Sequence, residues 1–435
     1  SMKPYPVITT AIALAALVGV SSTRVHADAV TDWSVVLGDA QKASGQMSSG
    51  QSRSGAIVHA AIFDAINGIV RKYTPYFVTD DPPRGAHAEA AGVQAAYTTC
   101  ASLYPAQLAL FDAQLAISLA AIPGQPGNSQ SIADGRTWGQ QVAQTILSWR
   151  STDGLRNVFS YLGVEQPGCW RTPTAGLSGV NVNLATMEPF TMKSCAQFRL
   201  PPPYGSVDRL TAIATSAYAA DVNEVKDYGS ATSALRTPEQ ADIALFWNAI
   251  SVADQNRVLR ELAPASFKLV DTARLFALCN LAAGDASIAM YDTKYAYDLW
   301  RPIHAIRLAD TDNNAATDAD PAWNSLIATP RHPEYPSAST TLSSAMFGAA
   351  ALLLGDVHTF TLSTPGFPSL TRTYTNFTAA AQESAEARIW IGFHFRTSCE
   401  EGLDAGYEIA NHAVAKFMRP LRRGDCWPFR PRESL

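Results

Sequence analysis

The chain has 435 residues, of which 47% are hydrophobic and 16% are charged. This length can bury a large core in one big domain or in two halves, and the composition excludes an intrinsically disordered protein. The formal net charge of -5 leaves no basic excess to neutralise a polymer of phosphates, so we expect no nucleic-acid partner. A local cluster of cations inside such an acidic protein favours a small buried anion instead.

The N-terminus has the pattern of a secretory signal peptide over residues 1–27. Lys3 precedes an apolar run from Val7 to Val20, and Val25-His26-Ala27 places small residues where a signal peptidase reads them. This run of about 14 residues is shorter than the roughly 20 that a spanning helix requires, although a signal anchor is the alternative. We therefore expect a periplasmic or secreted protein without stable membrane insertion.

The six cysteines are expected to lie in an oxidising compartment. The sequence contains no Cys-x-x-Cys motif, which argues against a zinc ribbon. Cys169 and Cys195 flank a stretch rich in proline and glycine that a disulfide would clip. Cys399 and Cys426 would tie the C-terminal tail to the body. The remaining two, at 100 and 279, fit buried thiols, and the sequence leaves the pairing open.

The first third of the chain is predicted to be an antiparallel helical bundle. Apolar residues recur at helical spacing over Ser52–Val70, Ala86–Tyr104, Ala106–Ile122 and Ser131–Arg150. From about Ser151 to Ser206, prolines and glycines make a sustained helix implausible. We expect this stretch to cross the surface over the mouth of the site, with a domain division inside it.

Helical patterns return in the second half of the chain. The helices are expected at Val207–Tyr228, Thr237–Ala263, Ala265–Tyr291, Ser337–Leu354, Thr378–Phe393 and Ser398–Met418. Residues 310–322 form an acidic loop, and 357–374 a small hairpin. The prediction is a mostly α protein, with residues 28–206 as an N-terminal bundle plus loop and 207–435 as a C-terminal bundle.

The first of three informative blocks runs from Lys294 to Pro302. Lys294 and Arg301 are seven residues apart, which on a helix is two turns and therefore one face. Two such cations can contact separate oxygens of one oxyanion, with the arginine acting as a planar fork. The alternative interpretation is a solvated helix face carrying ion pairs.

The second block, His332-Pro-Glu-Tyr-Pro336-Ser337-Ala338-Ser339, leads into an Ala-rich apolar run. Pro and Ser at this point predict a helix N-terminus, whose free N–H groups and dipole favour an anion. The hydroxyls of Ser337, Ser339 and Thr340 can cap the helix or donate to the anion. Ordinary capping by serine explains this block equally well.

The third block is Arg388-Ile-Trp-Ile-Gly-Phe-His394. We expect it on a helix ending near Phe395-Arg396, where a spacing of six does not put Arg388 and His394 on one face. Both reach one site only if the helix distorts or the anion lies between them. A lone histidine among aromatic residues is otherwise a satisfied core residue. The three blocks together are more specific than any one of them.

In this order, the blocks resemble the signature Lys-x6-Arg-Pro, Pro-Ser-Gly-His and Arg-x5-His of the vanadium-dependent haloperoxidase and type 2 phosphatidic acid phosphatase superfamily. The resemblance is to its bacterial haloperoxidase-like branch, and it extends to His59-Ala-Ala-Ile-Phe63-Asp64-Ala-Ile-Asn67 and to Gly392-Phe-His394-Phe-Arg396. It covers most of the chain after residue 27 and is greatest in the final third. It implies a vanadium chloroperoxidase-like α fold of two four-helix bundles.

The resemblance also implies a cofactor, vanadate, held covalently by His394 as its one metal ligand, in a site that phosphate can share. Hydrogen peroxide and a halide would be the substrates, with Lys294 polarising the bound peroxide. The oligomeric state stays open, with a homo-oligomer among the options. The implied cofactor-binding set is Lys294, Arg301, Ser337, the backbone N–H of Ala338, Arg388 and His394.

This chain departs from the signature at the second block, where Ser339 stands in place of the acid–base histidine and Ala338 in place of glycine. Serine has no pKa near neutrality for proton transfer, so anion binding is expected to survive while turnover is in doubt. His304, three residues after Arg301, and His332 are the candidate substitutes. We expect His304→Ala to abolish halide oxidation while leaving vanadate binding intact.

Two further functions compete with halide oxidation. An exported acid phosphatase would use the same oxyanion site with His394 as the nucleophile and a phosphate ester as substrate. A non-turnover oxyanion-binding protein is favoured by Ser339. An assay with vanadate, peroxide and bromide, beside one with a phosphate ester, separates the three functions.

Overall fold

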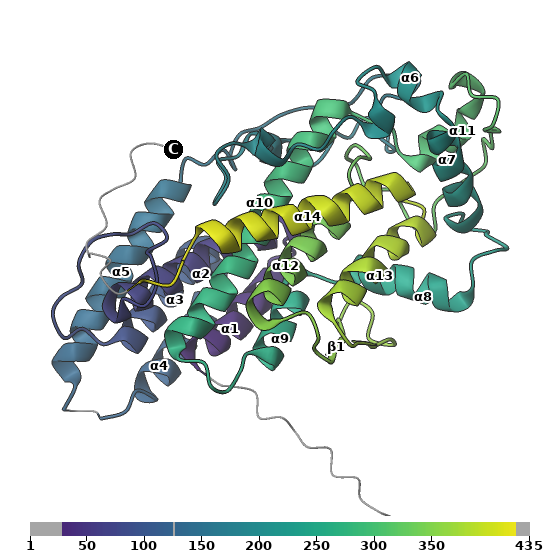
Figure 1. Cartoon of the computed structure of the whole chain (residues 1–435). Helices are drawn as coiled ribbons and strands as arrows, with labels where there is room; N and C mark the ends of the chain where they lie inside the picture. Colours follow the sequence, from purple (N-terminus) through teal and green to yellow (C-terminus); the bar gives the residue numbers. More distant parts are fainter. Residues whose placement is uncertain (1–27, 125–126, 423–435) are drawn as a thin grey trace, which may run out of the picture.

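A computed structural model describes residues 28–124 and 127–422 of the chain. The predicted signal peptide and Cys426 lie outside these residues. The molecule is an elongated assembly of helices around α10 (Leu269–Tyr297), which runs through its middle (Figure 1). Nearly every residue of α10 from Val270 to Lys294 is buried, because small and apolar side chains occupy all of its faces.

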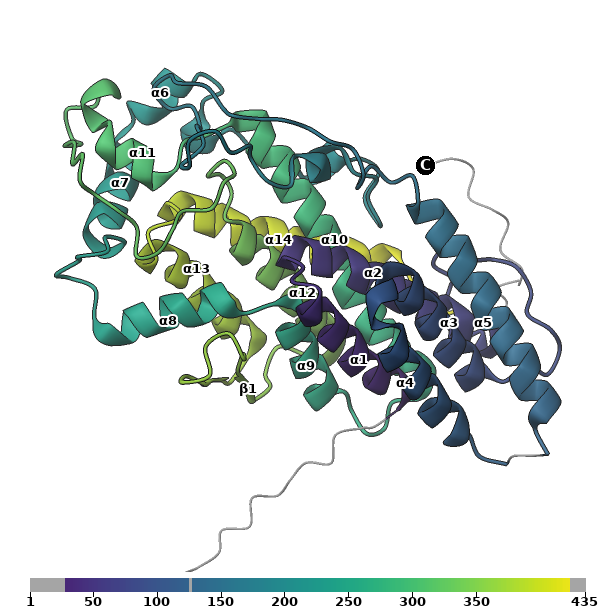
Figure 2. The ribbon, with the colours of Figure 1, turned by 180° about the vertical axis from the view of Figure 1, so that it is seen from behind.

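The helices of the first third of the chain form a group that extends from α10 to one end of the molecule (Figures 1 and 2). They are α1 (Ala29–Ala43), α2 (Ser48–Val70), α3 (Ala88–Leu103), α4 (Leu108–Ala120) and α5 (Ser129–Arg150), with a 3-10 turn η1 (Pro105–Gln107) before α4. The sequence patterns located four of these helices within a few residues and missed α1. Helices α3 and α5 pack closely because Gly139 has no side chain. A Cβ at this position would lie 2.1 Å from the carbonyl oxygen of Ala91.

An excursion without long helices was predicted for residues 151–206, and the structure has one over residues 151–208. This excursion contains only the short turns η2 (Val182–Thr186), η3 (Cys195–Phe198) and η4 (Pro203–Gly205). Buried Asp285 of α10 anchors it by accepting hydrogen bonds from the backbone N–H groups of Phe190 and Thr191, both at 2.7 Å. The excursion therefore lies along α10 rather than hanging free in solvent.

Two predicted long helices are each divided in two. Residues 207–228 form α6 (Arg209–Ile213) and α7 (Ser216–Tyr228), and residues 237–263 form α8 (Pro238–Ala249) and α9 (Val252–Leu262). The divisions fall where a hydroxyl side chain caps a new helix. Thr215 accepts from the N–H of Tyr218, and Ser251 forms a reciprocal capping box with Asp254. Helical periodicity continued across both caps, so it did not reveal them.

The C-terminal helices follow α10 in the chain. They are α11 (Pro302–Arg307), α12 (Ala338–Leu354), α13 (Phe377–Trp390) and α14 (Arg396–Lys416), with a 3-10 turn η5 (Ala309–Thr311). Two of them, α12 and α14, pack against α10. The predicted hairpin is present as β1 (Phe360–Leu362) paired antiparallel with β2 (Arg372–Tyr374). Helices α12 and α14 approach closely because Gly406 has no side chain. A Cβ at this position would collide with Ser344 Oγ.

Two apolar clusters hold these layers together. The larger extends from Val30 in α1 to Met418 after α14 and includes both groups of helices. The smaller is built around Trp300 and Tyr218 and includes Leu299, Tyr335 and Phe395. Leu299 and Tyr335 belong to the first and second sequence blocks, and Phe395 directly follows the third. Packing of the smaller cluster therefore brings the three blocks together.

The expected disulfides are not formed among the described residues. Cys169 and Cys195 are both free thiols, which contradicts the predicted clip. Cys399 is a free thiol buried in the smaller cluster, while its predicted partner is outside the described residues. Cys100 and Cys279 are buried thiols, as expected, and burial raises the pKa of both.

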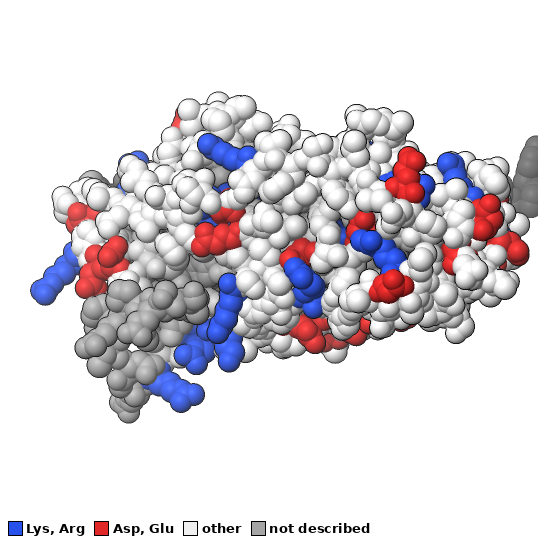
Figure 3. Space-filling model, turned by 90° about the horizontal axis from the view of Figure 1, so that it is seen from above, with Lys and Arg blue, Asp and Glu red and all other residues white. Residues whose placement is uncertain are grey.

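The described surface matches the acidic, mixed composition. On the face shown in Figure 3 most side chains are uncharged, and basic and acidic groups lie among one another. None of the helices in the described ranges combines the length and apolarity needed to cross a bilayer.

Candidate active site

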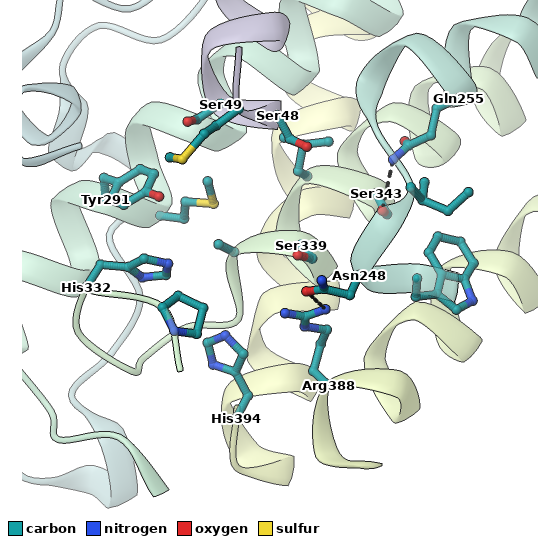
Figure 4. Close-up of a pocket in the computed structure, with 17 residues that line it drawn as sticks. Ser48, Ser49, Asn248, Gln255, Tyr291, His332, Ser339, Ser343, Arg388 and His394 are labelled. Carbon is teal, nitrogen blue, oxygen red and sulfur yellow. Dashed lines mark hydrogen bonds between the residues drawn. The ribbon is translucent and has the colours of Figure 1, made fainter. Parts of the chain in front are cut away.

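A cavity of about 180 Å³ lies where the N-termini of α2 and α12 meet the turn after α13 (Figure 4). Its lining is mixed. Polar groups come from six helices and two loops, and apolar groups close the remaining sides. The lining residues are Met47, Ser48, Ser49, Trp247, Asn248, Ile250, Gln255, Met290, Tyr291, Pro330, His332, Ala338, Ser339, Leu342, Ser343, Arg388 and His394.

Lys294 and Arg301 do not share a helix face, which corrects the first sequence expectation. Helix α10 ends at Tyr297, because Asp298 adopts the left-handed conformation with φ 53°. Arg301 is the N-cap of the next helix, α11. The two cations meet through the chain reversal between these helices rather than through helical spacing.

The ammonium group of Lys294 is fully buried and donates to the loop of the second block. It donates to the carbonyl oxygens of Pro333 at 2.9 Å and Glu334 at 2.8 Å, and also to that of Pro336. Burial, with Arg301 nearby, lowers the pKa of Lys294 well below its ordinary value. Its three N–H donors are thus occupied, and Lys294 is not among the cavity-lining residues. Lys294 holds this loop and places a positive charge behind the wall of the cavity.

Arg301 links the second and third blocks from a fully buried position. Its Nε donates to the His332 carbonyl at 2.7 Å, and its Nη1 donates to the Phe393 carbonyl at 2.9 Å and to His394 Nε2 at 3.0 Å. Its Nη2 lies 2.9 Å from Nδ1 of His332. Burial lowers the pKa of Arg301 to about 10, which keeps it charged at neutrality. One guanidinium therefore bridges the two imidazoles that face the cavity.

Arg388 and His394 reach one site because the helix between them ends early. Helix α13 stops at Trp390, and Gly392 takes φ +82°. A Cβ there would lie 2.4 Å from the Gly229 carbonyl oxygen, so a glycine is needed at this position. The Arg388 carbonyl then accepts from the N–H groups of Phe393 at 3.1 Å and His394 at 3.3 Å. The expectation that the helix continues to residue 395 is wrong, and the turn solves the spacing problem.

The Arg388 side chain enters the cavity with spare donors. It is 4% exposed, and its Nε has no hydrogen-bond partner in the described part of the chain. Its Nη1 has only a long contact, at 3.5 Å, with Asn248 Oδ1, and the guanidinium lies over the Phe393 ring at 5.0 Å. Burial lowers its pKa to about 10, so it remains a cation at neutrality.

Glu334 is a buried carboxyl group that the sequence reasoning missed. Its Oε1 accepts from His394 Nδ1 at 2.9 Å and from the Phe395 N–H at 2.9 Å, while its Oε2 accepts from Ser398 Oγ. Burial raises the pKa of Glu334 to about 7, and burial with Arg301 lowers that of His394 well below its ordinary value. With Nδ1–H donating to Glu334, the lone pair of His394 is on Nε2, the atom toward Arg301.

One feature of the sequence was available to identify Glu334. It is an acidic residue between two prolines in a stretch that leads into a buried helix start. Other missed lining residues have no such signal, since Ser48, Ser49, Asn248 and Gln255 belong to helices far from the three blocks. Tyr291 lies one helical turn before Lys294 and was missed as well.

Some residues of the second block line the cavity, and others lie behind those lining residues. Ala338 and Ser339 line the cavity at the first turn of α12, where the backbone N–H groups have no acceptor within the helix. Ser337 is the N-cap and fully buried, and its hydroxyl pairs with Thr340 Oγ1 at 2.7 Å. Ser337 is thus not among the lining residues, whereas the resemblance implied that it contacts the anion.

The two candidate substitute histidines are separated by the fold. His332 lines the cavity, and its ring meets that of Tyr291 edge-on at 5.4 Å. His304 is on α11, is not a lining residue, and its Nδ1 is buried without a partner among the described residues. The structure brings His332 to the cavity and does not bring His304 there.

The charges around the cavity favour an anion. Lys294, Arg301 and Arg388 are 0–4% exposed, and Glu334 is the carboxyl group bonded within the same cluster. Burying an excess of cations is costly unless a counter-charge compensates it. The free donors of Arg388 and the first turn of α12 face the space in which such an anion would lie.

Comparisons with known proteins relate part of the chain to a known domain and most of the chain to a known fold. The family model of the VCPO second helical-bundle domain matches residues 274–423. Vanadium chloroperoxidase of Curvularia inaequalis is 29% identical over a stretch that covers 26% of this chain and 23% of that protein. The matched stretch is thus less than a quarter of the length of that relative.

Three solved structures share the fold along most of the chain. A bacterial vanadium-dependent iodoperoxidase has a TM-score of 0.75 and 22% identity, covering 90% of this chain and 97% of that chain. The apo form of a bacterial vanadium-dependent chloroperoxidase has a TM-score of 0.67 and 19% identity, covering 85% and 92%. A holo form has a TM-score of 0.67 and 17% identity, covering 91% and 93%. Residues 274–423 therefore match the vanadium chloroperoxidase second helical-bundle domain, and the chain shares the fold of the bacterial vanadium-dependent iodoperoxidase and chloroperoxidase.

Proposed function

We propose that the protein is an exported vanadium-dependent haloperoxidase that oxidises halide with hydrogen peroxide. The observation that carries the proposal is the set of buried cations around His394, whose Nε2 lone pair faces Arg301 while Nδ1 is held by Glu334. The similar bacterial proteins include an iodoperoxidase and a chloroperoxidase. The signal peptide over residues 1–27 and the division of the chain into domains at 28–206 and 207–435 remain predictions.

The residues present fit a tetrahedral oxyanion such as vanadate. The excess of buried positive charge needs a counter-anion, and Arg388 Nε is a buried donor without a partner in the described part of the chain. Arg388, the hydroxyl of Ser339 and the N–H groups at the start of α12 would hold its oxygens, and His394 Nε2 would bond its central atom. Bound vanadate would supply a Lewis acid that activates hydrogen peroxide toward halide.

The chain itself prepares this site by orientation and charge. Glu334 fixes the tautomer and ring orientation of His394, as carboxylates do for metal-bound histidines. Lys294 holds the loop from Pro333 to Pro336 and stabilises negative charge without lining the cavity. Arg301 Nη1 donates to the atom that would bond the anion, so bonding there requires Arg301 to exchange His394 Nε2 for an oxygen of the anion.

A two-arm assay tests the proposal. The purified protein is incubated with orthovanadate, hydrogen peroxide and iodide, bromide or chloride, and halogenation of a dye is followed. Turnover that requires both vanadate and peroxide is expected, while an equal rate without vanadate would contradict the proposal.

The second arm contains p-nitrophenyl phosphate and no vanadate. Phosphate-ester hydrolysis is the runner-up function, because a Glu334-paired imidazole is also suited to act as a nucleophile. Hydrolysis without halide oxidation would identify a phosphatase. Vanadate binding with neither activity would leave a non-turnover oxyanion-binding protein.

A further inference from the structure

A second cavity, of about 260 Å³, lies where α2, α3 and α5 meet the start of the excursion of residues 151–208. These three helices lie side by side (Figure 2). Among the described residues, the second cavity shares no lining residue with the candidate active site. Any ligand that it holds is therefore distinct from the oxyanion proposed above.

The lining of this second cavity carries more positive than negative charge. Arg53, Arg150 and Arg156 are lining residues, and Asp153 is the carboxyl group beside them. Arg53 Nε donates to Asp153 Oδ2 at 2.8 Å, and Arg150 Nη2 lies 2.9 Å from the same oxygen. The side chains of Arg150 and Asp153 are 1% exposed, and that of Arg53 is 11% exposed. Two nearly buried cations thus share one buried anion, and one positive charge is left uncompensated.

The arginines of this cavity keep donors for a ligand. Arg53 uses Nε toward Asp153 and Nη2 toward the Arg150 carbonyl oxygen at 3.0 Å. The two N–H groups of its Nη1 have no acceptor in the described part of the chain. Arg156 is exposed and forms no ion pair with another described residue. Two guanidinium groups can therefore donate to one anionic head group.

A neighbouring carboxyl group, that of Glu188, does not fill the cavity. Its side chain is exposed and accepts from Trp149 Nε1 at 2.8 Å, and it is not a lining residue. Arg150 donates instead to the backbone carbonyl oxygens of Glu188 and Pro189, at 2.7 Å and 3.1 Å. Arg150 therefore holds the excursion in place, while donors of Arg53 stay available.

The same cavity also has an aliphatic wall. Ile57, Leu103, Leu147 and Leu155 form it, and the described lining includes no aromatic ring. Aromatic ligands gain stability from aromatic partners, so this wall favours an alkyl chain over a flat ring. The volume is below the roughly 300 Å³ at which pockets for drug-sized ligands begin, so the chain must be short.

We propose that this cavity binds a small amphipathic monoanion, a carboxylate on a short alkyl chain. The carboxylate oxygens accept from Arg53 Nη1 and from Arg156, since a planar guanidinium matches a carboxylate. The alkyl chain packs against the aliphatic wall. One uncompensated charge matches a monoanion, whereas a phosphate monoester carries about 1.5 to 2 negative charges at pH 7. The inference does not depend on the proposed function.

Calorimetric titration of the full chain with hexanoate tests this proposal. Hexanol keeps the chain without the charge, and acetate keeps the charge with almost no chain. We expect hexanoate to bind at least about tenfold more tightly than either probe, because each of them lacks one of the two contacts. Hexyl phosphate, the fourth probe, should bind more weakly than hexanoate because it carries more charge than the cavity compensates.

Two substitutions locate the binding. Arg156→Ala removes an exposed side chain and should weaken hexanoate binding about three- to tenfold, with circular dichroism unchanged. Arg53→Met removes the free donors while Arg150 keeps its ion pair, and the loss should be at least about tenfold. Arg257→Ala is the matched control, because Arg257 forms its ion pair within α9 and does not line the cavity.

Each contact of the proposed ligand has a result that would contradict it. Equal affinity for hexanol and hexanoate would rule out the charged contact, and tighter binding of hexyl phosphate would rule out a monoanion. Hexanoate binding that survives both Arg53→Met and Arg156→Ala would place the ligand elsewhere, and its displacement by orthovanadate would place it in the candidate active site. Absence of binding by every probe would remove the site altogether.

Discussion

Two histidines of this protein are equally buried and chemically opposite. His59 in α2 and His394 after α13 are 1% and 2% exposed, and burial is the largest cause that lowers the pKa of each. His59 packs against the Phe276 ring at 5.1 Å, and neither of its ring nitrogens has a hydrogen-bond partner in the described part of the chain. His394 has Glu334 on one nitrogen and Arg301 on the other.

The difference shows that burial neutralises an imidazole but does not make it reactive. His59 lies on α2 among residues of the larger apolar cluster, with the Phe276 ring beside it. His394 lies in a turn, where Arg301 at the start of α11 and Glu334 in the loop before α12 bond its two ring nitrogens. A defined tautomer and an available lone pair come from those partners. Four substitutions sharpen or break this comparison.

The largest effect is expected for His394→Ala. Removing the nitrogen that would bond the anion should abolish halide oxidation and weaken vanadate binding beyond detection by calorimetry, while circular dichroism stays unchanged. His59→Leu is the matched control, because it replaces an equally buried histidine and should bind vanadate as the wild type does. Normal vanadate affinity in His394→Ala would contradict the assigned bond.

Glu334→Gln is expected to have the next largest effect. The amide removes the buried negative charge and no longer enforces the Nδ1–H tautomer of His394, so vanadate affinity should fall about 10- to 100-fold. The measurement is calorimetric titration with orthovanadate, with the tautomer followed by nitrogen NMR of the histidine ring. Glu261→Gln serves as control, since Glu261 pairs with Arg257 on α9 and neither residue lines the cavity. An unchanged tautomer would remove Glu334 from this role.

The lowered pKa of His59 predicts that the free energy of unfolding depends on pH. Its folded pKa is about 3, below the ordinary value of 6.5, so the unfolded chain takes up a proton as pH falls below 6.5 and the folded chain does not. Stability is therefore lost between pH 6.5 and pH 3, by about 2 kcal/mol on going from pH 7 to pH 5. Urea unfolding of His59→Leu should lack this part of the slope. An identical slope in both proteins would show that other groups cause it.

The smallest effect is expected for Arg388→Lys. The charge is kept but the planar fork is lost, so oxyanion affinity should fall about tenfold with little change in stability. Arg274→Lys is the control, because Arg274 is on α10, donates to the Met418 carbonyl and does not line the cavity. Equal affinity in the Arg388 and Arg274 variants would mean that Arg388 is not an anion ligand.

Much of the site was predictable because its chemistry is carried by a few residue types. Three cations, one histidine and a serine-rich helix start were identified from the blocks, and Arg388, Ala338, Ser339 and His394 do line the cavity. Lys294 and Arg301 were also identified, but their predicted shared helix face is wrong. The left-handed residue Asp298 between them ends α10, and helical periodicity carries no sign of it.

The sequence by itself determined that the protein is mostly helical and roughly where most helices run, and it predicted that cations and an imidazole form one site. These properties follow from local periodicity and residue chemistry. Only the tertiary structure decided that Glu334 holds His394, that His332 rather than His304 reaches the cavity, and that Gln255 and Ser48 complete its lining. Those contacts join residues tens to hundreds of positions apart, and long-range packing, not any local pattern, sets which of them meet.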